Sequence, residues 1–209
     1  MGFYPVALDL SGKLCLVVGG GVVALRKVRA LLFSDAVVRL VSPDLTPELR
    51  ELQTQSKLKY RSGYYQTTDL DGVFLVICAA GDPATNRQVA ADCAARNLPL
   101  NVVDQPELCG FLVPAVVRRG DLTIAVSTGG KSPLLARKLR ERLERDFSPQ
   151  YGEYLDLLAE ARQRTLNSVR DPAKKRDILE DLVSPEILTL LAENRLDLVK
   201  ERITLLLRA

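Results

Sequence analysis

Residues 14–24 read Leu-Cys-Leu-Val-Val-Gly-Gly-Gly-Val-Val-Ala, and this stretch is the strongest indication of the fold. A continuous apolar run stops at three glycines and then resumes with helical spacing. Gly19, Gly21 and Ala24 match the dinucleotide-binding fingerprint, which needs a tight turn, a close backbone approach to a pyrophosphate and close helix packing. The start of that helix offers unpaired N–H groups to phosphates. The stretch predicts a nucleotide site, and the alternative is a glycine-rich turn that holds no ligand.

Composition excludes several classes of protein. The chain has 209 residues, 47% hydrophobic and 26% charged, which is ordinary for a globular protein of one or two domains. A net charge of +3 does not argue for nucleic acid as a partner. We find no run of membrane-spanning length and no signal peptide. The four cysteines lack metal-site spacing, so we expect a reduced, cytoplasmic protein.

The chain contains no histidine. This excludes a Ser-His-Asp triad, a Cys-His pair and a histidine-ligated metal site. Proton transfer must therefore come from another side chain or from a cofactor, and we expect no resident metal.

Apolar runs of strand length alternate with helical patterns through the first 126 residues. Because the runs are apolar throughout, we expect strands buried on both faces, joined by helices into a doubly wound parallel sheet. Residues 58–65 are a weaker candidate strand. The expected strands are 14–18, 37–41, 73–79, 100–103 and 122–126, with helices at 22–33 and 86–96 between them.

The pattern becomes helical throughout in the second half of the chain. We expect helices at 133–147, 151–167, 172–182 and 185–207, with a boundary at Ser148-Pro149. Pro172 and Pro185 suit first helical positions, and Asp171 and Ser184 suit the N-caps before them. The chain is thus an α/β nucleotide domain, a connecting segment and a helical domain.

An acid near the end of the second strand normally holds the ribose, about 20 residues past the glycines. Asp44 is the candidate here, and Pro43 stiffens the turn before it. The alternatives are a plain loop aspartate or a cap on a short helix at Pro47. A carboxylate at this point would favour NAD over NADP, and Arg39, inside the strand, is less suited to reading a phosphate.

Two further strand ends carry small or acidic residues. Ala80, in the sequence Ala-Ala-Gly-Asp at 79–82, leaves room for a cofactor across the carboxyl ends of the strands. The alternative role of this segment is a plain turn in which Asp82 caps the next helix. Asp104 ends the sequence Asn-Val-Val-Asp and is the leading candidate for a general base, although a turn-forming aspartate is an equal alternative.

A second glycine-rich turn lies between an expected strand and an expected helix. Two glycines, a lysine and a helix N-terminus form an anion site, and here they suit a polycarboxylate substrate. The alternative is simple capping, with Ser132 as N-cap and Pro133 at the first helical position. The candidate substrate residues are Thr128, Gly129, Gly130, Lys131 and Ser132.

Taken together, these segments resemble the siroheme synthase N-terminal family, also called precorrin-2 dehydrogenases. The resemblance covers about residues 3–145 in four ordered blocks, whereas the C-terminal helices match only in general character. The blocks are Tyr4-Pro5-Val6 with Leu8; Val17 to Gly21 with Val23, Ala24, Arg26 and Lys27; Asn101 to Asp104 with Glu107 to Cys109, Phe111, Pro114 and Ala115; and Ser127 to Pro133 with Leu135 to Arg137, Leu139 and Arg140.

The resemblance implies NAD-dependent oxidation of precorrin-2 to sirohydrochlorin in siroheme biosynthesis, and in some members insertion of ferrous iron. It implies a homodimer with a Rossmann-type NAD-binding domain (1–113), a dimerisation region with the anion loop (114–148) and a helical C-terminal domain (149–209). Asp104 matches the catalytic aspartate. Val22, Val23, Pro43 and Asp44 match positions that contact NAD, but many relatives carry an acid where this chain has Val22. A fused methyltransferase domain, present in longer relatives, is not expected.

Two other functions are compatible with the residues. A non-catalytic NAD-sensing module would explain the first glycine turn but not a lysine-bearing anion loop together with Asp104. A chelatase without redox activity would not need the intact dinucleotide fingerprint.

Overall fold

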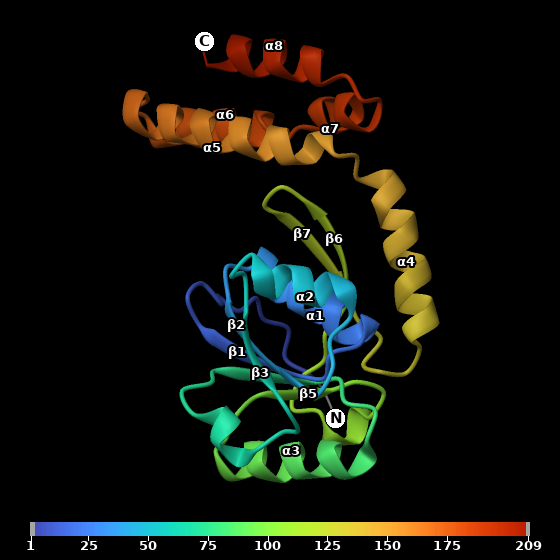
Figure 1. Ribbon diagram of the computed structural model, residues 1–209. Coiled ribbons are helices and arrows are strands. Elements are labelled where there is room, and N and C mark those ends of the chain that lie inside the picture. Colours follow the sequence, from blue (N-terminus) through green and yellow to red (C-terminus); the bar gives the residue numbers. More distant parts are fainter. Residues whose placement is uncertain (1–2, 208–209) are drawn as a thin grey trace. The chain divides into compact units, whose positions relative to one another are not determined.

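The computed structural model describes residues 3–207, and the chain divides into two compact units, Met1–Val113 and Pro114–Ala209 (Figure 1). The first unit is built on five parallel strands in the order β3-β2-β1-β4-β5. Its strands are β1 Leu14–Val18, β2 Val37–Ser42, β3 Lys59–Ser62, β4 Leu75–Cys78 and β5 Leu100–Val102, and its helices are α1 Val22–Phe33, α2 Pro47–Thr54, α3 Pro83–Ala95 and the short 3₁₀ turns η1 Thr67–Leu70 and η2 Pro106–Leu108.

Helices cover both faces of this sheet (Figure 1). Successive residues of β1 belong in turn to the two hydrophobic cores, one on each face of the sheet. Cys15 and Val17 pack with α1 and α2, whereas Leu16 and Val18 pack with α3. Burial on both faces explains why the strands are apolar throughout rather than alternating. The expected α/β parallel sheet is confirmed, including the weaker strand β3.

The expected strand at 122–126 does not join the parallel sheet. It is β7, Leu122–Val126, and it pairs antiparallel with β6, Ala115–Arg119, in a separate two-stranded sheet of the second unit. Thr123 and Ala125 are exposed, whereas Leu122, Ile124 and Val126 are half-buried. That alternation is typical of a strand with one face exposed to solvent. The sequence did not show the alternation clearly, because Ala125 is apolar although it lies on the exposed face.

The rest of the second unit is helical, with α4 Pro133–Asp146, α5 Gln150–Ser168, α6 Pro172–Asp181, α7 Pro185–Ala192 and α8 Leu196–Leu206. The expected single helix at 185–207 is wrong, because Asn194 adopts φ +59°, a left-handed conformation that ends a helix. Asp171 caps α6 as expected, whereas the side chain of Ser184 makes no capping bond within residues 3–207. None of the helices described here is long and apolar enough to span a membrane.

Candidate cofactor site

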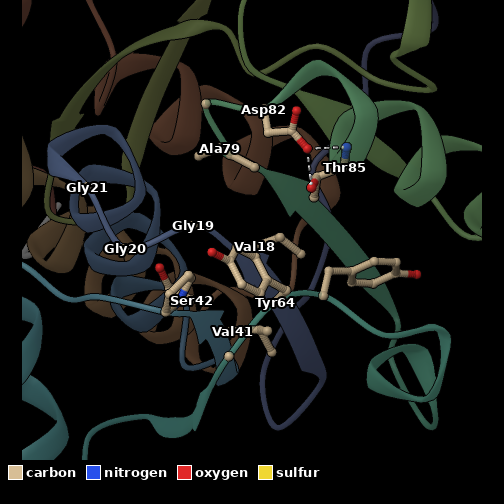
Figure 2. Close-up of a pocket in the computed structure, with 15 residues that line it drawn as sticks. Val18, Gly19, Gly20, Gly21, Val41, Ser42, Tyr64, Ala79, Asp82 and Thr85 are labelled. Carbon is tan, nitrogen blue, oxygen red and sulfur yellow. Dashed lines mark hydrogen bonds between the residues drawn. The ribbon is translucent and has the colours of Figure 1, made fainter.

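A cavity of about 390 Å³ opens at the carboxyl ends of the strands of the first unit (Figure 2). Four loops meet there: the turns after β1, β2, β3 and β4. This is the position where open α/β sheets bind ligands. The lining residues are Val18, Gly19, Gly20, Gly21, Val41, Ser42, Pro43, Gly63, Tyr64, Tyr65, Ala79, Ala80, Gly81, Asp82 and Thr85.

The glycine turn after β1 is tightly enclosed on one side and open on the other. Gly19 has φ +115°, and a Cβ there would lie 2.4 Å from the carbonyl oxygen of Ala79. A Cβ at Gly20 would lie 1.9 Å from the carbonyl oxygen of Asp44. At Gly21, by contrast, a Cβ would meet no atom of the described residues within 4 Å. The turn therefore presents bare backbone at Gly21 to the cavity, as pyrophosphate binding requires.

The end of β2 closes the neighbouring side of the cavity. Ser42 is buried, and its carbonyl oxygen accepts a hydrogen bond of 2.8 Å from the hydroxyl of Tyr60. Pro43 and Asp44 are exposed on the turn that follows. Thr46, not Asp44, caps α2, since its Oγ1 accepts from the backbone N–H of Leu49. The capping alternative for Asp44 is therefore wrong.

The turn after β4 lines the cavity and also caps the next helix. Ala80 and Gly81 line the cavity. The carboxylate of Asp82 accepts from the backbone N–H groups of Ala84 (3.2 Å) and Thr85 (2.9 Å), so it caps α3. These hydrogen bonds, with one from the Thr85 hydroxyl as the largest contribution, lower the pKa of Asp82. The carboxylate therefore stays charged and keeps the start of α3 fixed at the cavity.

The turn after β3 contributes residues that the sequence analysis missed. Tyr64 and Tyr65 both line the cavity, and Arg61 and Asp69 support them from behind. Arg61 forms an ion pair with the buried Asp69 carboxylate and donates to the carbonyl oxygen of Tyr64 at 2.8 Å. No sequence motif identifies these residues, because they are held in place by an ion pair across the turn and not by residues at a characteristic spacing.

Asp104 lies just past β5, on an exposed turn. Its backbone adopts φ +60°, a left-handed conformation that aspartate tolerates better than most residues. The preceding Val103 donates its N–H to the carbonyl oxygen of Cys78, the last residue of β4. Asp104 therefore stands at the same sheet edge as the cavity, one strand away from the turn that contains Ala80.

A cation lies near Asp104. The pKa of Lys27, on α1, is lowered mainly by burial and then by Arg26, and Cys109 and Asp104 act in the opposite direction. Cys109 is itself held against the strand end, since its sulfur accepts from the N–H of Val102 at 3.2 Å. Burial is the main factor that raises the thiol pKa of Cys109, so the thiol stays neutral.

The second glycine-rich turn belongs to the second unit, between β7 and α4. Ser132 caps α4, accepting from the N–H of Leu135 at 3.2 Å, and the capping interpretation is confirmed. Thr128 uses its hydroxyl to accept from the N–H of Ser132 and to donate to the Ser132 carbonyl oxygen. Gly129 and Gly130 have positive φ, and Lys131 is exposed. The loop is thus preorganised, with the lysine side chain facing solvent.

Comparison with known proteins adds the family. The family described as "Putative NAD(P)-binding" matches residues 6–115, more than half of the chain. The chain belongs to this family. A second family, "Sirohaem biosynthesis protein central", matches residues 119–146. The resemblance to siroheme synthases that the sequence blocks indicated is therefore confirmed.

Individual proteins agree with this assignment. A "Siroheme synthase" of Thioalkalivibrio sulfidiphilus is 41% identical over 201 residues, covering 96% of this chain and 41% of the relative. Another from Pseudomonas fluorescens is 42% identical over 182 residues, covering 87% and 39%. The chain thus spans about two fifths of the length of these curated relatives. The solved structure of "SirC, precorrin-2 dehydrogenase" superposes with a TM-score of 0.78 at 27% identity, covering 95% of this chain and all of SirC.

The predicted cofactor residues divide into two groups. Gly19, Gly21, Pro43 and Ala80 line the cavity. Val22, Val23 and Asp44 lie outside its lining as residues 3–207 form it, and Val22 is 75% exposed. Contacts of the second group with NAD remain a prediction.

The cavity fits a nucleotide on three grounds. Its volume is in the range of small-molecule sites, its floor is bare glycine backbone, and α1 directs its N-terminus at it. The arginines of β2 and β3 are engaged within the protein: Arg39 donates to the carbonyl oxygens of Asp69 and Asp71, and Arg61 is paired with Asp69. Neither arginine lines the cavity that residues 3–207 form, which favours NAD over NADP. No group of three or more acidic or cysteine side chains placed to hold a metal occurs in the described part of the chain.

Proposed function

We propose that the protein oxidises precorrin-2 to sirohydrochlorin with NAD⁺. The observation that carries the proposal is the position of Asp104 on the turn after β5, at the same edge of the sheet as the cofactor cavity. The match to SirC along that protein's whole length supports the tetrapyrrole substrate.

The reaction removes two electrons as a hydride and releases one proton from precorrin-2. When bound, the nicotinamide supplies the hydride acceptor. Asp104 accepts the proton, since its carboxylate is exposed and is held on a turn in a fixed conformation. The glycine turn orients the cofactor, and Asp82 keeps the neighbouring wall in place.

The loop of the second unit supplies the substrate contacts in this proposal. Lys131 is an exposed ammonium at the start of a helix whose dipole favours anions. The substrate is a polycarboxylate, so Thr128, Gly129, Gly130, Lys131 and Ser132 would bind its acidic side chains. Residues 114–148, which contain this loop, would also form the dimerisation region, with residues 149–209 as a separate helical domain.

Three further points belong to the same proposal. Ferrous iron would be a second substrate, with the Asp104 carboxylate taking protons from the pyrrole nitrogens as iron enters. The protein would act as a homodimer, because Leu134, Leu135 and Leu139 expose apolar surface on α4. It would work in the cytoplasm, since all four cysteines, which lie in the described part of the chain, are free thiols.

An anaerobic assay tests the redox step. Purified protein, NAD⁺ and precorrin-2 should produce NADH and sirohydrochlorin in equal amounts, followed by their absorbance. Absence of NADH would refute the proposal, and binding of NAD⁺ without turnover would instead support a sensing module. Adding Fe²⁺ to sirohydrochlorin under the same conditions tests the iron step through the absorbance of siroheme.

A further inference from the structure

The turn after β3 is anchored at three successive residues. The N–H of Gly63 donates to the carbonyl oxygen of Ser42 at 3.1 Å. The carbonyl oxygen of Tyr64 accepts from Arg61 at 2.8 Å. The hydroxyl of Tyr65 donates to the Asp92 carboxylate at 3.0 Å. The backbone of Tyr64 is therefore fixed from both sides.

The side chain of Tyr64 is exposed despite this fixed backbone. Tyr64 is 79% exposed, whereas the adjacent Tyr65 is only 7% exposed. Figure 2 shows the ring of Tyr64 at the cavity wall, directed toward Ser42. A large apolar ring gains nothing for folding in such a position. A rigidly mounted aromatic ring does suit a flat ligand, because little conformational entropy is lost when the ligand stacks on it.

The strand order decides which part of the nucleotide meets this ring. Tyr64 follows β3, and Asp104 follows β5, which are the two outer strands of the sheet. The glycine turn, where the pyrophosphate would lie, follows the central strand β1. If the reacting end of the cofactor lies toward Asp104, as the proposed function requires, the adenosine half extends toward β3.

We infer that Tyr64 is the stacking platform for the adenine ring, a role that rests on the proposed function and defines the adenine half of its cofactor site. Arg61 and Asp69 are the positioning residues that hold this platform. Recognition uses the face of the base, so other adenine nucleotides, AMP included, should bind at the same place.

Titration calorimetry on the full chain tests the role, with NAD⁺ and AMP as ligands. Tyr64→Ala should weaken AMP binding by about 5- to 100-fold, the range that loss of one stacked base produces. Tyr64→Phe keeps the ring and should bind AMP within about threefold of the native protein. Tyr4→Ala is the matched control, because Tyr4 is 87% exposed and lies outside the cavity lining formed by residues 3–207.

A fluorescent analogue reports stacking directly. The emission of 1,N⁶-etheno-AMP should be quenched by the native protein and by Tyr64→Phe, and should remain bright with Tyr64→Ala at saturating protein. Equal AMP affinity in the native protein and Tyr64→Ala would overturn the inference, and so would equal losses in Tyr64→Ala and Tyr64→Phe. Native protein that binds NAD⁺ and AMP but forms no NADH would refute the proposed reaction. The AMP affinities of the variants would still test the role of Tyr64 in that case.

Discussion

Arg61 and Asp69 form an ion pair in which the carboxylate is 5% exposed and the arginine side chain 34% exposed. The Asp69 carboxylate also accepts from the backbone N–H of Gln66 at 2.8 Å, and Arg61 holds the carbonyl oxygen of Tyr64. One pair thus joins β3, η1 and the wall of the cofactor cavity. We therefore expect this ion pair to affect both the stability of the protein and its affinity for the nucleotide.

Arg61→Met should therefore lower both properties. The variant leaves a buried carboxylate without its cation, which we expect to cost roughly 2 kcal/mol of unfolding free energy, below the cost at a fully buried pair because Arg61 is partly exposed. AMP affinity should fall as well, because Tyr64 loses its anchor. Denaturant unfolding and calorimetry measure the two effects. Arg96→Met is the control: its pair with Asp71 is exposed to solvent, so this substitution should leave stability nearly unchanged. Equal effects of the two variants would contradict the prediction.

Asp104→Asn should separate binding from chemistry. Asparagine keeps the size of the side chain and also tolerates the left-handed backbone at this position. Without a carboxylate, kcat should fall by at least about 10²-fold, the scale of general-base catalysis. The Kd for NAD⁺ should stay within twofold, because Asp104 lies outside the lining of the cavity among the described residues. Normal turnover by this variant would show that another group accepts the proton.

The stability of the first unit should fall above pH 9. Burial raises the thiol pKa of Cys15, Cys78 and Cys93 from 9.0 to about 11. The folded state therefore holds these protons after the unfolded chain has lost them. The stabilisation is complete below pH 9 and disappears as pH rises toward 11. At pH 10 the free energy of unfolding should be lower by about 1 kcal/mol for each of these thiols. Urea unfolding at pH 8, 9 and 10 measures how the free energy of unfolding depends on pH, and Cys93→Ala should make that dependence weaker. The same pH dependence in this variant and in the native protein would contradict the prediction.

Lys131→Ala tests the anion loop of the second unit. The ammonium should contribute to substrate binding and not to hydride transfer, so KM for precorrin-2 should rise by about fivefold or more while kcat changes little. The increase should shrink at high salt, because an exposed ion pair is screened. Lys138→Ala, on an exposed position of α4, is the matched control. Identical KM values in the two variants would show that Lys131 does not bind the substrate.

The sequence predicted the first unit well because its signals are local. The glycine turn and the unbroken apolar strands need only sequence spacing, and they identified β1, α1 and the edge at which the cavity lies. The hairpin of β6 and β7 was missed because its strands are only half-buried, so they lack an unbroken apolar run and their pairing depends on contacts across the turn. Tyr64 was missed for a similar reason. Its role depends on Arg61 and Asp69 holding a turn, and no single stretch of sequence records that arrangement.

The glycine turn offers a test in which two neighbouring substitutions should behave differently. In Gly19→Ala the new Cβ would lie 2.4 Å from the carbonyl oxygen of Ala79, with φ at +115°. Both clash and backbone strain oppose folding, so stability should fall by about 2 kcal/mol or more. Gly21 has φ −87°, and its Cβ would point into open space within the described residues. Gly21→Ala should fold like the native protein, yet its methyl group would occupy the space that a pyrophosphate needs. Its Kd for NAD⁺ should rise about tenfold or more. Thermal unfolding and NAD⁺ titration separate the two outcomes, and tight NAD⁺ binding by Gly21→Ala would show that the pyrophosphate does not approach this glycine.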